Sequence, residues 1–229
     1  MPAMGTDALR GIVNRLVAAY ESFLREVEHF RSHDDYDCLF GPRDDSGIPP
    51  SAAGGVRWQA DLRWPFEAEQ AWFRTRLTIP ERVAGVPVSG AATLSYASVM
   101  SSELYINGDR RLSEPWWTAL DVPLSDAVRP GDTFDIAIRM RRIDGNDFMY
   151  GFPPQVIVDS VEEAAVHVGA FVRAAELMLR CIELRQVRDT RLTSLVASVM
   201  ERVPVALLED RNLPAFLRFV REVQRDLAP

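Results

Sequence analysis

The first thirty residues place apolar side chains three and four positions apart, which is the spacing of one face of an α-helix. Arginine and glutamate fill most of the remaining positions. We therefore expect an amphipathic helix from about Asp7 to Phe30, and its apolar face needs a packing partner. That face consists of Leu9, Ile12, Val13, Leu16, Val17, Tyr20, Phe23, Leu24, Val27 and Phe30.

The pattern changes in the middle of the chain. Residues Ser32 to Gly55 are rich in Asp, Gly, Pro and Ser and predict a loop or linker. From about Val56 to Ser160 apolar and polar residues alternate, most clearly in AWFRTRLTIP and DTFDIAIRM. Alternation of this kind is typical of half-buried strands. Because Pro-Gly, Asn-Gly and Ala-Gly turns separate the strands and no helical pattern intervenes, the segment predicts an antiparallel β-sandwich.

The last zone returns to helical spacing. Ser160 and Glu163 have the spacing of a capping box, and a second helix near Thr190 is expected to end before Pro204. A third helix is expected to begin after Asn212. We expect the N-terminal helix to pack with these helices, since both present apolar faces. The predicted organisation is residues 1–55 (helix and linker), 56–160 (sandwich) and 161–229 (helical connector or bundle).

The composition of the chain argues against several classes of function. The formal net charge is -7, which argues against nucleic acid as a partner because phosphate binding needs positive charge. All 26 basic residues are arginine, so lysine-based covalent chemistry is excluded. No run of eighteen apolar residues predicts a membrane span, and the N-terminal residues do not have the pattern of a secretory signal. Cys38 and Cys181 lack metal-type spacing, and we expect idle thiols in a reducing, cytoplasmic location.

The order of motifs in the middle zone resembles a known domain. Trp72-Phe73-Arg74, Ile79-Pro80, Tyr105-Ile106-Asn107-Gly108, Leu120-Asp121-Val122 and Arg129-Pro130-Gly131 follow one another along about the central third of the chain. The series resembles the galactose-binding-like jelly roll that precedes the catalytic domain in several glycoside hydrolase families. The hydrophobic pattern and this resemblance together predict an α+β chain, with an antiparallel jelly-roll β-sandwich flanked by an N-terminal helix and a C-terminal helical bundle.

The helices that follow the sandwich make the resemblance more specific. A jelly roll followed by a helical connector resembles the N-terminal region of glycoside hydrolase family 38, the α-mannosidases. In that family a zinc-dependent catalytic domain comes next and opens with a His-x-His motif. The histidines here are His29, His33 and His167, and no two are separated by one residue. We therefore expect no catalytic residue and no cofactor in this chain, with zinc confined to the catalytic domain of a parent enzyme.

Two adjacent tryptophans are the best candidates for carbohydrate contact. The faces of Trp116 and Trp117 could stack on a pyranose ring, while Arg110, Arg111 or Asp121 bond its hydroxyls. The alternative, and the commoner situation for tryptophan, is that they pack beneath their loop or against a neighbouring domain. The aromatic stretch NDFMYGFPP leaves the same two interpretations open.

A metal site is the weaker hypothesis. His29 and His33 are four residues apart and could ligate zinc from one helix face with a nearby carboxylate, but the helix is expected to end there. The paired aspartates at Asp34-Asp35 and Asp44-Asp45 lack calcium-loop spacing and are interpreted as surface charge.

These observations favour a non-catalytic accessory region of an α-mannosidase-like glycoside hydrolase. Its partners would be the catalytic domain of the parent enzyme or further copies of itself, with carbohydrate as a ligand and neither nucleic acid nor membrane. The first alternative is a free-standing carbohydrate-binding module that uses Trp116 and Trp117. The second is a helical protein-interaction domain without sugar affinity.

Overall fold

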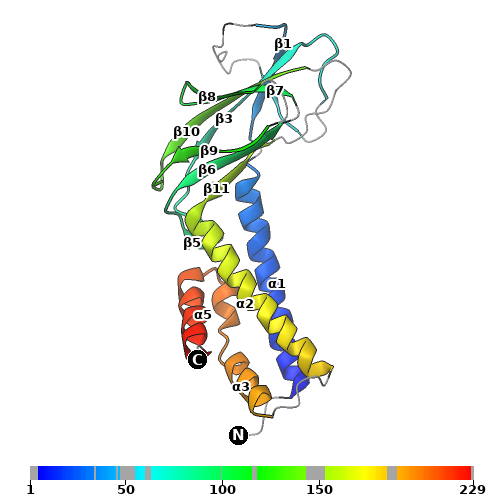
Figure 1. The fold of residues 1–229 in the computed structure, drawn as a ribbon, viewed down its shortest axis with the longest axis vertical. Helices are drawn as coiled ribbons and strands as arrows, with labels where there is room; N and C mark the ends of the chain where they lie inside the picture. The colour runs from blue at the N-terminus through cyan, green and yellow to red at the C-terminus, as the bar shows by residue number, and fades with distance from the viewer. Residues whose placement is uncertain are drawn as a thin grey trace. The chain divides into compact units, whose positions relative to one another are not determined.

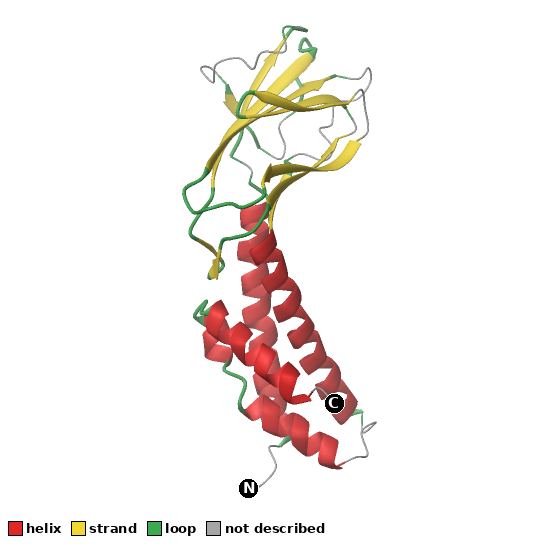
Figure 2. Ribbon diagram, turned by 60° about the vertical axis from the view of Figure 1, so that its left-hand side comes forward, coloured by secondary structure: helices red, strands yellow, loops and turns green. Residues whose placement is uncertain are grey.

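The chain forms two compact units in the computed structural model, which describes residues 5–33, 35–44, 46, 55–59, 63–98, 100–114, 118–142, 153–184 and 190–227. The helical unit consists of Met1–Glu28, Arg82–Pro87 and Ser160–Pro229. The sandwich unit consists of His29–Glu81 and Val88–Asp159. Figure 2 distinguishes the strands in yellow from the helices in red. The structure confirms the predicted α+β class, with antiparallel sheets and helices before and after the sandwich in chain order.

The sandwich unit contains two antiparallel sheets (Figure 1). The larger sheet has the strand order β2-β1-β3-β10-β7-β8, and the smaller has the order β11-β6-β9. Their strands are β1 (Asp37–Gly41), β2 (Val56–Arg57), β3 (Gln70–Thr78), β6 (Ala92–Ser98), β7 (Ser101–Ile106), β8 (Asp109–Glu114), β9 (Thr118–Ser125), β10 (Thr133–Arg141) and β11 (Gln155–Val158).

The alternation in β3 and β10 defines the core of this unit, as predicted. Phe73 and Ile138 are opposite one another in the register and are completely buried. Leu104 of β7 continues the same row and is also buried. The smaller sheet contributes Leu94 and Val156, another opposed and fully buried pair. Period-two sequence patterns thus specify the faces that become the dry interior.

One part of the predicted loop is a strand. Within Ser32 to Gly55, residues Asp37–Gly41 form β1, which pairs with β3 along its whole length. Its only fully buried side chain is Cys38, so the alternation is too short to outweigh the surrounding Asp, Gly and Pro in the sequence. The pairing with β3 is a long-range contact that composition does not report.

The helical unit contains α1 (Thr6–Arg31), α2 (Asp159–Glu183), α3 (Thr190–Glu201), α4 (Val205–Glu209) and α5 (Leu213–Leu227). Helices α1 and α2 are antiparallel neighbours, since Arg10 bonds Glu183 near one end and Tyr20 lies against Gly169 further along. A Cβ added at Gly169 would lie 2.3 Å from the Tyr20 hydroxyl, so the absent side chain lets the helices approach. These contacts confirm that the N-terminal helix packs with the C-terminal ones. The short α4 was not predicted.

A small hairpin from the middle of the sequence also belongs to the helical unit. Strands β4 (Arg82–Val83) and β5 (Val86–Pro87) are joined by Ala84 and Gly85, which both have positive φ, at 49° and 84°. A two-residue turn of this type suits a tight antiparallel hairpin. A Cβ added at Gly85 would lie 2.1 Å from the Arg211 carbonyl oxygen. Arg211 in turn bonds Ser22 and Glu26 of α1.

Among the helices of the described residues, none has the length and apolar run needed to cross a membrane.

Candidate functional site

The outer face of the larger sheet carries a buried polar row. Alternation directs Trp72, Arg139 and Glu103 away from the Phe73 face, and the register places them side by side on β3, β10 and β7. Trp72 and Arg139 are each 3% exposed, so this part of the face is covered rather than open to solvent. Tyr105, two residues after Glu103 on the same face, is also buried.

Hydrogen bonds and ring contacts connect this row, which we call the Arg139 cluster (Trp72, Glu103, Tyr105 and Arg139). Arg139 Nη2 donates to Glu103 Oε1 at 2.5 Å, and the Tyr105 hydroxyl donates to Glu103 Oε2 at 2.5 Å. Arg139 Nη1 donates to the carbonyl oxygen of Asp44 at 2.6 Å. The Arg139 guanidinium carbon lies 5.3 Å from the centroid of the Trp72 ring, and the Trp72 and Tyr105 rings are 5.5 Å apart. These contacts hold the four side chains of the cluster in one arrangement.

The environment of Glu103 keeps it ionised. Burial by itself raises the pKa of Glu103, but the hydrogen bonds from Tyr105 and Arg139 and the charge of Arg139 outweigh burial and lower the pKa below its usual value. Burial and the Glu103 carboxylate raise the pKa of Tyr105, so its hydroxyl remains protonated and keeps its donor role. Glu103 is thus a poor general acid at neutral pH.

Next to the Arg139 cluster lies a cleft of about 540 Å³. We call it the Tyr105 cleft; its lining residues are Arg74, Tyr105, Asn107, Gly108, Thr133, Asp135, Ile136 and Ala137. The turn at its edge has positive φ at Asn107 (53°) and Gly108 (85°), as the Asn-Gly sequence predicts. Asn107 Oδ1 accepts a hydrogen bond from the Asp135 backbone N–H at 2.9 Å, and this bond fixes the turn to β10.

The polar groups of the Tyr105 cleft suit the recognition of hydroxyl groups. Arg74 offers guanidinium donors, Thr133 offers a hydroxyl, and Asp135 offers carboxylate acceptors. A hydrogen bond from Arg76, at 2.8 Å from Nε to Oδ1, is the main cause that lowers the pKa of Asp135. The Glu103 and Asp135 carboxylates are therefore ionised. Glycoside hydrolysis needs one carboxyl kept protonated as the acid, so this pair fits binding better than catalysis.

The residues predicted to contact carbohydrate do not all lie on the same sheet. Arg110 of β8 is opposite Tyr105 of β7, on the face that carries the cleft. Arg111 is the extra residue where the register shifts, and its guanidinium lies 3.7 Å from Asp109. Asp121 is on β9 of the smaller sheet, opposite Ser95, and is exposed. Trp116 and Trp117 lie outside the described residues, as does most of the aromatic stretch, so the stacking hypothesis stays a prediction.

Sequence reasoning missed Arg74, Thr133 and Asp135. The sequence presents Arg74 as part of the Trp72-Phe73-Arg74 motif and Asp135 as part of an alternating segment, but neither as a binding residue. Each of the three lies at a polar position of a strand whose alternate positions are apolar. That pattern predicts that the side chains face outward, but it does not predict the position of the cleft.

Among the described residues, the histidine pair is not arranged as a metal site. Helix α1 ends at Arg31, so His29 and His33 do not share a helix face. His33 Nε2 lies 2.8 Å from the Thr75 hydroxyl, and its ring meets Tyr36 edge-on. Within the described ranges there is no group of three histidine, cysteine or acidic side chains that could hold a metal ion.

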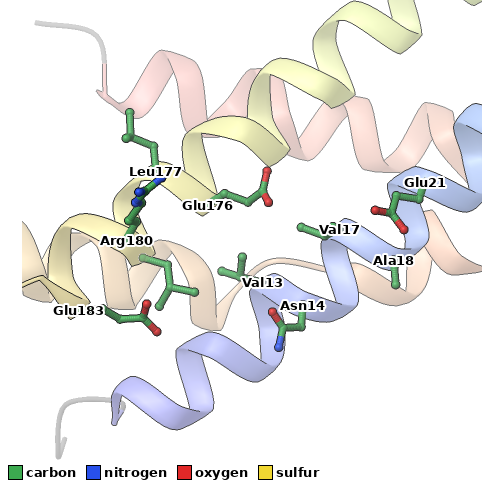
Figure 3. A pocket seen from close by; sticks show the side chains of 10 residues that line it. Val13, Asn14, Val17, Ala18, Glu21, Glu176, Leu177, Arg180 and Glu183 are labelled. Atoms are coloured by element: carbon green, nitrogen blue, oxygen red, sulfur yellow. The ribbon is translucent and has the colours of Figure 1, made fainter.

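A second hollow, of about 790 Å³, lies between α1 and α2 in the helical unit (Figure 3). Val13 and Leu179 form its apolar floor, and Glu21, Glu176 and Arg180 border it. At one end Glu183 pairs with Arg10 at 2.8 Å. Mixed charge above an apolar seam is the usual surface of two packed amphipathic helices, and we assign it no chemistry.

Comparisons with known proteins give only distant similarities. No family model and no curated protein match this sequence. Among solved structures, a glycosyl hydrolase family 2 member from Bacteroides cellulosilyticus is 15% identical with a TM-score of 0.40, covering 55% of this chain and 20% of its own. A β-glucuronidase from Faecalibacterium prausnitzii is 10% identical with a TM-score of 0.36, covering 46% of this chain and 20% of its own. A β-glucuronidase from Ruminococcus gnavus is 16% identical with a TM-score of 0.37, covering 49% of this chain and 21% of its own.

Similarity at this level assigns no family. The chain spans about one fifth of the length of these enzymes. None of the three is described as an α-mannosidase.

Proposed function

We propose that this chain is a non-catalytic accessory region that contacts carbohydrate through the Tyr105 cleft. The observation that carries the proposal is the cleft itself, an open hollow whose donors and acceptors come from neighbouring strands. A sugar presents several hydroxyls at fixed spacing, and groups on a sheet can match that spacing without rearranging. The ionised states of Glu103 and Asp135 favour binding over hydrolysis.

The test is a titration of the whole chain with sugars, measured by isothermal titration calorimetry. Methyl α-mannoside and short mannosides come first, because of the family resemblance, and glucuronides and galactosides follow. We expect binding in the millimolar range that weakens at least about tenfold in Arg74→Ala, since a hydrogen bond from a charged group contributes roughly 1.5–3 kcal/mol. Arg63→Ala is the matched control, because Arg63 is an exposed arginine of the same unit that does not line the cleft.

The variants separate two locations for the site. If Trp117→Ala abolishes binding while Arg74→Ala binds normally, the tryptophan stretch is the contact surface and the Tyr105 cleft is not. If no sugar binds the unmodified chain at millimolar concentrations, the carbohydrate function is wrong.

The finer proposal is that the parent protein is an α-mannosidase-like glycoside hydrolase in a cytoplasmic location. Its support is the ordered motif series from Trp72-Phe73-Arg74 to Arg129-Pro130-Gly131, followed by α2. The natural reading frame provides the test. A downstream segment with His-x-His and an acidic residue would support it, and a different catalytic domain or none would overturn it.

A second candidate function is docking of a protein partner on α2. Val166, Leu177 and Leu184 are 62%, 61% and 57% exposed. Val166 and Leu177 lie on α2, and Leu184 directly follows its last residue, with its N–H bonded to the Arg180 carbonyl oxygen at 3.0 Å. The three residues are eleven and seven positions apart, so at about 100° per residue they fall within about 20° of one line that continues the helix. An exposed apolar stripe of this kind marks interaction surfaces.

Sedimentation equilibrium of the whole chain tests this candidate for self-association. Leu177→Glu should convert an oligomer to a monomer, whereas Ser198→Glu, which adds the same charge at an exposed position of α3, should not. A monomer at all concentrations would leave only a different protein, such as the catalytic domain, as the partner.

A further inference from the structure

We propose that the helical unit binds one aliphatic chain of about ten carbons in a hollow between α2, α3 and α5. This inference is independent of the carbohydrate function, because it concerns the other unit. The hollow has a volume of about 270 Å³. We call it the apolar hollow; its lining residues are Ala170, Phe171, Ala174, Ala175, Met178, Leu195, Val196, Val199, Met200, Val223 and Gln224.

The chemistry of the lining selects the ligand. Among the described residues that line the hollow, Gln224 is the only polar one and none is charged. Gln224 alone can form hydrogen bonds there, and no lining residue can compensate a buried charge, so water and sugars gain little in the hollow. Met178 and Met200 add flexible, polarisable side chains, which adapt to ligands of irregular shape.

The shape of the apolar hollow is maintained by packing of one of its lining residues, Phe171, against α5. Phe171 meets Phe216 and Phe219 of α5 edge-on, at ring-centroid distances of 5.9 and 6.1 Å and interplanar angles of 86° and 81°. Phe216 is completely buried, so this aromatic contact is part of the bundle core. Phe171 therefore cannot swing into the hollow without losing both contacts.

The entrance lies where α2 has small side chains. Ala170 and Ala174 are exposed and line the hollow, as do exposed Leu195 of α3 and Gln224 of α5. A chain can therefore enter between α2 and α3 with its polar end left in water near Gln224. An apolar cavity of about 150 Å³ accepts benzene, with six carbons, so about 270 Å³ corresponds to about ten.

The ligand is a free single-chain molecule rather than a membrane lipid, because the volume matches one short chain. The probe is a series of straight-chain carboxylates from hexanoate to hexadecanoate, kept below their micelle concentrations and measured by displacement of a fluorescent naphthalene dye. Affinity should rise about fourfold per methylene, which corresponds to about 0.8 kcal/mol, and level off near ten carbons.

Two variants test the location. Ala174→Trp should block the entrance and reduce decanoate affinity at least tenfold. Ala18→Trp is the matched control, since Ala18 is an exposed alanine on α1 that borders the charged hollow instead. If Ala174→Trp does not fold, Val199→Ala still tests the proposal, because the enlarged hollow should move the plateau to chains one or two carbons longer.

Three results would overturn the inference. The first is decanoate affinity that Ala174→Trp leaves unchanged. The second is affinity that keeps rising through hexadecanoate, which would indicate nonspecific apolar binding. The third is binding to phosphatidylcholine vesicles with none to monomeric decanoate, which would identify a membrane surface instead.

Discussion

Arg139 and Glu103 form a hydrogen-bonded ion pair, 2.5 Å from Nη2 to Oε1, on the face of the larger sheet that the strand pattern marks as polar. The side chains are 3% and 15% exposed. A buried guanidinium without its carboxylate would lose its main compensation for desolvation. The pair therefore makes strong predictions for the stability of the sandwich unit.

We expect Glu103→Ala to lower the free energy of unfolding of the sandwich unit by about 3 kcal/mol, because it leaves the Arg139 charge buried and uncompensated. All five tryptophans belong to this unit, so tryptophan fluorescence during urea unfolding reports it separately from the helices. Arg76→Ala breaks the exposed pair with Asp135 and should have a much smaller effect, because solvent screens that pair. Equal effects of the two variants would contradict the assignment.

The same carboxylate makes the unit sensitive to acid. The pKa of Glu103 is lower in the folded chain than its ordinary value of 4.5. Its contribution to stability is therefore present above pH 4.5 and is lost as the pH falls through the lower, folded value. Urea midpoints measured from pH 7 to pH 3 should fall more steeply in the unmodified chain than in Glu103→Gln. Parallel curves would mean that Glu103 is not the titrating group.

Substitution of Gly85 should destabilise the helical unit. Gly85→Ala combines a left-handed φ of 84° with a contact of 2.1 Å between the new Cβ and the Arg211 carbonyl oxygen. We expect a loss of about 2–3 kcal/mol, seen in helical circular dichroism during thermal unfolding. Gly108→Ala has nearly the same φ, 85°, but nothing within 4 Å of the new Cβ. It should cost only about 1 kcal/mol, detected by tryptophan fluorescence.

The two cysteines should differ in reactivity. Burial raises the pKa of Cys38 to about 12, so almost no thiolate forms at pH 8. Cys181 is partly exposed. Ellman's reagent at pH 8 should therefore label one thiol in the native chain and two in urea. Cys181→Ser should abolish native labelling, and Cys38→Ser should leave it intact; the reverse pattern would contradict the burial of Cys38.

Sequence patterns predicted the main elements but not what covers them. The apolar phases of β3 and β10 identify the core face, because burial there follows directly from side-chain alternation. The same alternation marks Trp72, Glu103 and Arg139 as an outer face, and their burial depends on chain segments such as Asp44 that arrive from elsewhere. Strand β1 was missed for the same reason, since its pairing partner β3 begins 29 residues after β1 ends.

The sequence identified only residues at the edge of the Tyr105 cleft. The Asn107-Gly108 turn and Arg110 were identified from the sequence, and the structure places both on the side of the larger sheet that carries the cleft. Asp121 was grouped with them because it is near in sequence, but its strand belongs to the other sheet. Arg74, Thr133 and Asp135 come together only through the pairing of β3 with β10, which no local pattern encodes.

The β4–β5 hairpin has a consequence for how this protein can be dissected. It lies in sequence between two stretches of the sandwich unit, yet it belongs to the helical unit. No single cut in the gene separates the two units. A fragment that begins at Ser160 would lack both α1 and the hairpin, and a fragment that ends at Asp159 would carry them without their helices. Independent expression of either unit therefore requires a rearranged gene, with Arg82–Pro87 replaced by a short linker in the sandwich and supplied anew to the helices.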